Sequence, residues 1–399
     1  MEVITLLVVT ALVLILGVFG EFFFTKTKLP EVLWLIIVGI IVGPLTGLII
    51  LDAGSTMVQF FAALALIIVM FDGGLHLKMF DVIKNSYKSA LLGVLGFFSS
   101  MIIVTAVLLI ADMVGYIQIS LINALLLGSI LGGTSSLIVI PMIRKAGVSS
   151  KVEGILSIES ALTDALSVVI ALALIQVAVS ATADIQIVAS QIVAQFAVGI
   201  VLGFVVGIIW LYTMKSAYIK HVYNKSYTLT FAVLLLLYAG TGFVGGSAAI
   251  ACLVFGLILG NTKQVSAMFK LKTNISIDGK VQEFNSLVTF FVKTIFFALI
   301  GMFIILEPQF LLLGVIIAIL LLFPRILVAK VVFKGDKITR KESMIISGMI
   351  PRGLAAATLA TIPLTVGVPG SDIFQNIVFS TILFTVVVTT VMFYRSLKG

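Results

Sequence analysis

Residues 152–178 read VEGILSIESALTDALSVVIALALIQVA, an apolar stretch that carries two carboxylates, Glu159 and Asp164, in its interior. About 20 apolar residues cross the hydrocarbon core of a bilayer, so the stretch predicts a transmembrane helix. Asp164 lies about 13 residues, or roughly 20 Å, from the basic end of this helix at Lys151. That depth is near mid-membrane, where a charge costs roughly 3 kcal/mol or more and by default marks a functional site.

Comparable apolar stretches recur from one end of the 399-residue chain to the other. Hydrophobic residues make up 61% of the sequence and charged residues 11%, against roughly 25% charged in a soluble domain, so a soluble fold is excluded. The sequence therefore predicts an all-α polytopic membrane protein with about 13 transmembrane helices in one transmembrane domain over 1–399. The expected spans lie near 3–24, 31–50, 57–75, 88–111, 120–143, 152–178, 186–213, 228–243, 247–260, 284–305, 308–333, 343–366 and 373–394.

The basic residues fix the expected orientation of these spans. If the N-terminus lies outside, all of the 25 Lys and Arg residues except Lys293, Arg325 and Arg352 fall in inner connections. The charged residues of the outer connections are then all acidic. By the positive-inside rule this pattern predicts a multi-pass protein of the cell membrane with a cytoplasmic C-terminus. The net charge of +8 is thus explained by topology and contact with the inner leaflet, and no nucleic-acid partner is expected.

Two helix-breaking segments occupy equivalent places in an expected inverted repeat of spans 1–6 and 8–13. The fifth span contains GGTSS at 132–136, and the twelfth contains PRG at 351–353. Glycine loosens a helix and proline removes a backbone donor, so both spans are predicted to be interrupted where protein or a watery cavity covers the backbone. Inverted-repeat transporters bind their ions near such interruptions, which are predicted to cross. Ordinary kinks are the alternative interpretation.

The buried arginines offer partners for one of the two carboxylates. Glu159 and Asp164 differ by roughly 140° around the helix, so they can face different neighbours. Arg352 is the first choice of partner for Glu159 and Arg325 the second, because arginine holds a carboxylate with two parallel donors and keeps its proton. Asp164 is then left to change state. Burial favours its protonated form and a bound cation its ionised form, so proton and cation compete for one site.

Two further charged residues inside the predicted spans, Asp72 and Lys293, each have more than one possible role. Asp72 is followed by Gly73-Gly74 near the inner surface, and it is as consistent with a helix cap as with an ion ligand. Lys293 lies about nine residues from the inner interface and could extend its ammonium group to it. If Lys293 instead lies near Asp164 and titrates, a second proton could move.

Several other kinds of site are excluded by residue counts and context. The lone cysteine, Cys252, rules out an intramolecular disulfide and a cysteine-rich metal cluster. His76 and His221 are too few for a histidine-rich metal site, and no cofactor is expected. An intramembrane enzyme is not expected either, because Asp72 and Asp164 lack the G-x-G-D context of aspartyl proteases.

Three motifs resemble those of the cation/proton antiporter superfamily, and especially of the NhaP-type sodium/proton exchangers. Residues 159–164, ESALTD, are similar to the family's E-S-x-x-N-D signature. Residues 71–75, FDGGL, resemble its F-E-G-G-L, and residues 351–354, PRGL, resemble its arginine-glycine segment. The layout of thirteen spans matches along essentially the whole chain.

The resemblance implies that Asp164 binds both the transported cation and the proton. Ser160 and a backbone carbonyl near Thr134 would add ligands, and Asp72 would contribute. It also implies that Glu159 pairs with Arg352. The implied assembly is a homodimer in which core helices, about 88–178 and 308–394, move against dimerisation helices, about 3–75 and 186–305. No soluble regulatory domain is expected after Lys398.

Departures from the family pattern leave the choice of ion open. Thr163, counted here among the binding residues, stands where the family has Asn, and Ser135-Ser136 stand where it has Asp-Pro. Asp72 replaces Glu. The expected activity is exchange of Na⁺, K⁺ or Li⁺ for H⁺, with sodium first and with no net charge moved because Asp164 alone cycles. A sodium-coupled symporter of an organic anion and a cation channel are the alternatives.

Overall fold

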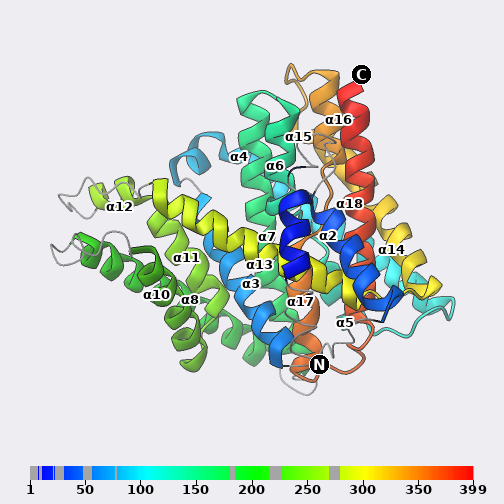
Figure 1. The fold of residues 1–399 in the computed structure, drawn as a ribbon, viewed down its shortest axis with the longest axis horizontal. Coiled ribbons are helices and arrows are strands. Elements are labelled where there is room, and N and C mark those ends of the chain that lie inside the picture. The colour runs from blue at the N-terminus through cyan, green and yellow to red at the C-terminus, as the bar shows by residue number, and fades with distance from the viewer. Residues whose placement is uncertain are drawn as a thin grey trace. The chain divides into compact units, whose positions relative to one another are not determined.

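The computed structural model describes residues 8, 11–20, 22, 31–47, 56–76, 79–179, 185–215, 226–268 and 279–398. Over these ranges the chain is helical and contains no strand (Figure 1). Several predicted connections, including the one with His221, lie outside the described residues. The chain divides into two compact units, Met1–Ala65, Asn85–Val179 and Phe291–Gly399 in the first, Leu66–Lys84 and Ser180–Phe290 in the second.

The first unit holds the carboxylate-bearing span and both helix-breaking segments. Two predicted spans are divided here, because 120–143 forms α5 and α6, and 343–366 forms α16 and α17. The elements of this unit are α2 (Glu31–Ile40), the π turn η1 (Ile41–Leu45), most of α4 (Met79–Met113), α5 (Leu121–Ile130), α6 (Ser136–Ala146), α7 (Ser150–Val179), the end of α13 (Gly279–Phe303), α14 (Pro308–Leu320), α15 (Leu322–Val332), α16 (Arg340–Gly348), α17 (Leu354–Thr365) and α18 (Phe374–Lys398).

The second unit is built on close contacts at glycines. Gly199 and Gly203 of α8 (Ile185–Lys215) lie against the backbone of α11 (Ala248–Gly260) at Ser247 and Ala251. Small residues at this spacing let helices approach closely in a membrane. The other described elements of this unit are the end of α3 (Thr56–His76), α10 (Ser226–Phe243) and α12 (Thr262–Met268).

Length and apolarity are consistent with a membrane-spanning fold. Within the described ranges, five helices are long and apolar enough to cross a bilayer, and α11 with α12, bent by 85° between them, makes a sixth candidate. Shorter apolar helices, including α5 and α17, make up the divided spans. The number of thirteen spans and the inverted repeat remain predictions.

Local sequence explains where the half-helices on the basic side begin and end. α6 ends at Gly147, whose φ of +61° is the left-handed conformation that glycine adopts readily, after Arg144 and Lys145 in the last turn. α16 begins with a capping box, in which Thr339 and Glu342 each accept a hydrogen bond from the other's backbone. In Figure 1, α15, α16 and α18 lie side by side at this end of the first unit.

Candidate functional site

The two interrupted helices meet at their breaks, as the sequence predicted. The backbone leaves helical geometry at 131–135 and again at 349–353, and both segments are buried. The Ser135 N–H donates to the Pro351 carbonyl at 2.8 Å. Gly353 lies directly against the side chain of Ser135, which leaves no room for a Cβ. Protein therefore covers the irregular backbone, the condition under which a bilayer tolerates it.

The Asp164 carboxylate lies at the start of the half-helix α6. Its Oδ2 accepts the backbone N–H of Ser136 at 3.1 Å and the Ser136 hydroxyl at 2.7 Å. Ser136 is the first residue of α6, so Asp164, on α7, acts as an N-terminal cap from another helix. The positive end of a helix dipole favours an anion at this position. Asp164 is 8% exposed.

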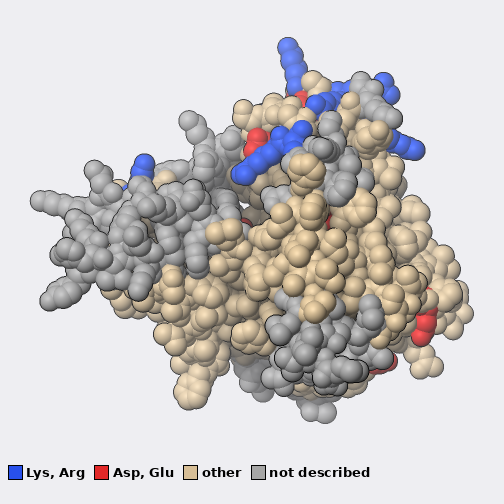
Figure 2. Space-filling view, in the orientation of Figure 1, with Lys and Arg blue, Asp and Glu red and all other residues tan. Residues whose placement is uncertain are grey.

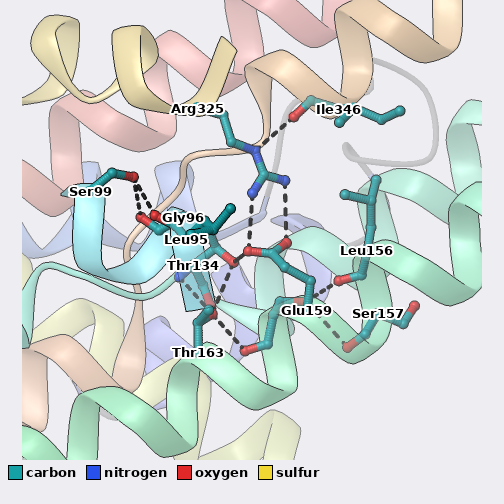
Figure 3. Close-up of polar contacts among 11 residues, drawn as sticks. Leu95, Gly96, Ser99, Thr134, Leu156, Ser157, Glu159, Thr163, Arg325 and Ile346 are labelled. Atoms are coloured by element: carbon teal, nitrogen blue, oxygen red, sulfur yellow. Dashed lines mark hydrogen bonds and ion pairs between the residues drawn. The ribbon is translucent and has the colours of Figure 1, made fainter. Parts of the chain in front are cut away.

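Glu159 forms a bidentate ion pair with Arg325 (Figure 3). Arg325 comes from α15, and its Nη1 and Nη2 lie 3.1 Å and 3.2 Å from Oε1 and Oε2. Its Nε donates to the Ile346 carbonyl in the last turn of α16 at 2.8 Å. Both charged side chains are buried, at 1% and 4% exposed. A buried pair needs such additional hydrogen bonds to offset the loss of hydration.

The prediction that Arg352 pairs with Glu159 is wrong. Arg352 lies in the crossing segment, where its backbone N–H donates to Thr385 Oγ1 at 3.1 Å. Within the part of the chain that the structure describes, Arg352 makes no ion pair, and its buried Nε has no hydrogen-bond partner. The charges that act on Arg352 are nevertheless those of Arg325, Glu159 and Asp164. With Asp164 ionised, these two arginines and two carboxylates sum to zero.

Thr134 and Thr163 brace the interruption against α7. The Thr134 N–H donates to Thr163 Oγ1 at 3.1 Å, and the Thr134 hydroxyl donates to Glu159 Oε1 at 3.1 Å. Thr163 Oγ1 also donates to the Ser160 carbonyl at 3.1 Å. These contacts fix the unwound backbone beside the ion pair, as the dashed lines of Figure 3 show.

Comparisons with known proteins show the family and the fold of the chain. A family model described as "Sodium/hydrogen exchanger, transmembrane" matches residues 8–398. The chain belongs to this family. The solved structure of the sodium proton antiporter MjNhaP1 from Methanocaldococcus jannaschii superposes with a TM-score of 0.77 at 20% identity over 100% of both chains. This likeness shows that the chain shares that all-helical fold.

Relatives of known sequence are named for two different activities. The K(+)/H(+) antiporter NhaP2 of Shewanella sp. strain ANA-3 is 25% identical over 91% of this chain and 61% of the relative. The Na(+)/H(+) antiporter ApNhaP of Aphanothece halophytica is 29% identical over 58% of this chain and 42% of the relative. The chain thus spans about three-fifths of the length of the first of these relatives.

The fold brings only some of the predicted binding residues to Asp164. Ser160 shares its helical face, but the Ser160 hydroxyl donates to the Leu156 carbonyl at 2.7 Å. Thr134 and Thr163 lie on the side of Glu159. The side chain that does contact the Asp164 carboxylate is Ser136, which was predicted as part of the helix break and as a departure from the family pattern, but not as a binding residue. Its signal was its position as the first residue after a predicted helix break.

The remaining two predicted charges, Lys293 and Asp72, lie elsewhere in the chain. Lys293 of α13 forms an ion pair with Glu31 of α2, and both side chains are 13% exposed. Asp72 lies within α3, in the part that belongs to the second unit, and Gly74 beside it packs on the α11 backbone at Leu253. α3 continues past Asp72 to His76, so Asp72 does not cap an end of α3. Its role as a ligand remains a prediction.

Proposed function

We propose that this chain is a secondary antiporter that exchanges a monovalent cation for protons at Asp164 by alternating access. The observation that carries the proposal is the placement of the Asp164 carboxylate at the N-terminus of a mid-span half-helix, beside a second carboxylate already neutralised by Arg325. Membership of the sodium/hydrogen exchanger family supports the proposal. So do the relatives whose printed names are K(+)/H(+) and Na(+)/H(+) antiporters.

The Ser136 hydroxyl can serve the ion site at Asp164 both when the site is empty and when a cation is bound. When Asp164 is ionised and empty, the Ser136 N–H and hydroxyl donate to Oδ2. A hydroxyl carries one donor and two acceptor lone pairs, so rotation of the Ser136 hydroxyl presents oxygen to a cation. Carbonyls of the unwound segment 131–135, with that of Thr134 first, supply further hard oxygen ligands. Oxygen ligands of this kind suit alkali cations.

The charges around Asp164 favour a stoichiometry of one proton exchanged for one monovalent cation. Asp164, Glu159, Arg325 and Arg352 together carry no net charge when Asp164 is ionised, because arginine stays protonated in proteins. A bound proton or a bound cation each leaves the site with one positive charge. Both loaded forms then have the same charge, so the exchange is electroneutral.

The proposal includes the wider arrangement expected from the sequence. We place the exchanger in the cell membrane with its N-terminus outside and C-terminus in the cytoplasm. The repeats are spans 1–6 and 8–13 of a 13-span fold, and the assembly is a homodimer. Core helices, about 88–178 and 308–394, move against a scaffold of about 3–75 and 186–305. Asp72, Ser160 and Thr163 are secondary candidates for the ion path.

Proton movement in liposomes tests the proposal. Purified protein is reconstituted with a trapped pH-sensitive dye, and Na⁺, K⁺ or Li⁺ is added outside. The wild type is expected to move protons in response to at least one cation, and Asp164→Asn to abolish the response. Glu153, a half-exposed carboxylate on the same helix, pairs with Arg144 near the basic end, and Glu153→Gln is the matched control that keeps the response. Folded protein with no response to any cation, or an unchanged response in Asp164→Asn, would contradict the proposal and favour a symporter or a channel.

A further inference from the structure

A cavity lies between the basic end of α15 and the neighbouring half-helix α16. Its volume is about 220 Å³. The polar lining is Lys330 of α15 with Ser343 and Ser347, which are four residues apart and therefore on one face of α16. The apolar lining includes Phe333, Ile338 and Ile346. One lysine and two serines thus line a cavity whose other lining residues are apolar.

The basic residues around this cavity exceed the acids that could neutralise them. Lys330, Lys334, Lys337 and Arg340 are exposed and, among the described residues, make no ion pair. The two nearby acids already have partners. Asp336 accepts Lys88 at 2.6 Å and Lys151 at 3.1 Å, and Glu342 is held by the cap at Thr339 and by Ser149.

Figure 2 shows the basic side chains gathered at this end of the first unit, over α15, α16 and the end of α18. An uncompensated positive surface of this kind attracts anionic headgroups of the cytoplasmic leaflet. A lipid whose phosphate is balanced by its own ammonium group would gain little there. The surplus of charge therefore favours a net-negative ligand over a zwitterionic one.

An apolar face of α15 leads to the cavity. Phe323 and Leu327 are 61% and 46% exposed, and with Lys330 they follow the i, i+4, i+7 spacing of one helical face. A soluble anion would leave this face uncovered, whereas an acyl chain can lie along it. The cavity is also smaller than the roughly 300–1,000 Å³ of sites for drug-sized ligands, so it fits a headgroup rather than a whole lipid.

We propose that this cavity binds the phosphate headgroup of an anionic phospholipid, with Lys330, Ser343 and Ser347 holding the phosphate and an acyl chain lying along Phe323 and Leu327. The phosphate of such a lipid offers acceptor oxygens that match one ammonium group and two hydroxyls. Lys334, Lys337 and Arg340 add attraction at longer range.

Lipid binding to the delipidated protein in neutral detergent tests the proposal. Dioleoyl phosphatidylglycerol or dioleoyl phosphatidylcholine is titrated in, and bound lipid is counted by native mass spectrometry. The wild type is expected to retain one phosphatidylglycerol at least about fivefold more tightly than phosphatidylcholine. Lys330→Gln is expected to weaken phosphatidylglycerol binding about fivefold, with a smaller loss for Ser347→Ala. Lys263→Gln, an exposed base on α12 of the second unit, is the matched control and leaves binding unchanged.

Three results would overturn the proposal. These are equal retention of the two lipids, an equal loss in Lys263→Gln and Lys330→Gln, and full displacement of bound lipid by soluble glycerol phosphate at the same concentration. The last result would indicate a site for free anions. If Lys330→Gln does not yield folded protein, Ser347→Ala provides the comparison with Lys263→Gln, because Ser347 lines the same cavity.

Discussion

Arg325 holds both carboxylate oxygens of Glu159 while its third donor, Nε, bonds to the Ile346 carbonyl. One guanidinium therefore connects α7, α15 and the last turn of the half-helix α16. That carbonyl is among the last four of α16, which have no partner within their own helix. The pair thus fixes an interrupted helix and neutralises Glu159, so that under the proposed function Asp164 is the carboxylate left to bind ions.

Removal of Arg325 is expected to destabilise the protein strongly. Arg325→Met leaves the Glu159 carboxylate buried without a counter-charge, and breaking a buried pair in this way costs about 3–5 kcal/mol. The unfolding temperature of the purified variant measures the loss. The double variant Glu159→Gln/Arg325→Met is expected to recover part of it, because no unpaired charge remains. A double variant less stable than Arg325→Met would show that the charge pair is not the cause.

The sequence was informative about the helix breaks and much less so about side-chain partners. Proline and glycine act on their own backbone, so the interruptions at 132–136 and 351–353 could be located from local chemistry. Arg325 and Arg352 were both predicted at mid-span depth, and nothing local indicates which of them faces Glu159. That choice depends on how α15 and the crossing segment pack on α7.

The same reasoning explains the two other differences at the site. Ser160 was placed beside Asp164 by helical spacing, but a serine inside a helix can bond to the carbonyl four residues before it, as Ser160 does with Leu156. Ser136 contacts Asp164 because α6 starts at that residue, and helix starts are predicted only to within a few residues. The side-chain contacts between helices could therefore be identified only in the structure.

Ser136→Ala is expected to weaken cation binding without preventing folding. The variant removes the 2.7 Å hydroxyl contact to Asp164 but keeps the 3.1 Å backbone contact. A hydrogen bond to a charged group contributes about 1.5–3 kcal/mol. Its loss favours the protonated form of Asp164, so the proton competes better with the cation and the apparent KM for the cation is expected to rise about tenfold or more. Dye-loaded liposomes at graded cation concentrations give this value. Ser129→Ala is the control, since the Ser129 hydroxyl bonds only within its own helix, to Leu126. Similar shifts in both variants would argue against a role for Ser136.

Gly353→Ala is expected to disturb the crossing of the two interrupted helices. A Cβ at Gly353 would overlap the Ser135 side chain, and overpacking of this kind costs about 1–3 kcal/mol. Both the unfolding temperature and the rate of exchange should fall. Gly154→Ala provides the comparison, because a Cβ there meets nothing within 4 Å and alanine favours a helix. Equal stability of the two variants would mean that the crossing can adjust at no cost.

Glu342 is expected to give the protein an acid-sensitive contribution to stability. Hydrogen bonds from the Ser149 hydroxyl, the Thr339 backbone and the Ser149 backbone lower the pKa of this carboxyl, which lies at the basic end outside the spans, to about 2. Because the folded pKa lies below the ordinary value of about 4.5, the contribution is complete above pH 4.5 and is lost as pH falls toward 2.

Unfolding temperatures measured across this pH range test the contribution of Glu342. Glu342→Gln is expected to have a lower unfolding temperature at neutral pH, and the difference from wild type should shrink as the pH falls. Arg340→Gln, an exposed neighbour on the same half-helix, should leave the pH dependence unchanged. A difference between Glu342→Gln and wild type that stays constant down to pH 2 would assign the effect to packing instead of charge.

Lys293→Gln is expected to leave the stoichiometry of exchange unchanged. Lys293 pairs with Glu31 on α2, so its charge is matched away from the Asp164 carboxylate and is not required to cycle. Liposomes with an imposed potassium-diffusion potential, or for a potassium exchanger an imposed anion gradient, report whether the rate of exchange depends on voltage. Wild type and Lys293→Gln should both be insensitive to the potential. A voltage-dependent wild type that becomes insensitive in Lys293→Gln would show that Lys293 carries a second proton, and the one-for-one exchange at Asp164 would then be wrong.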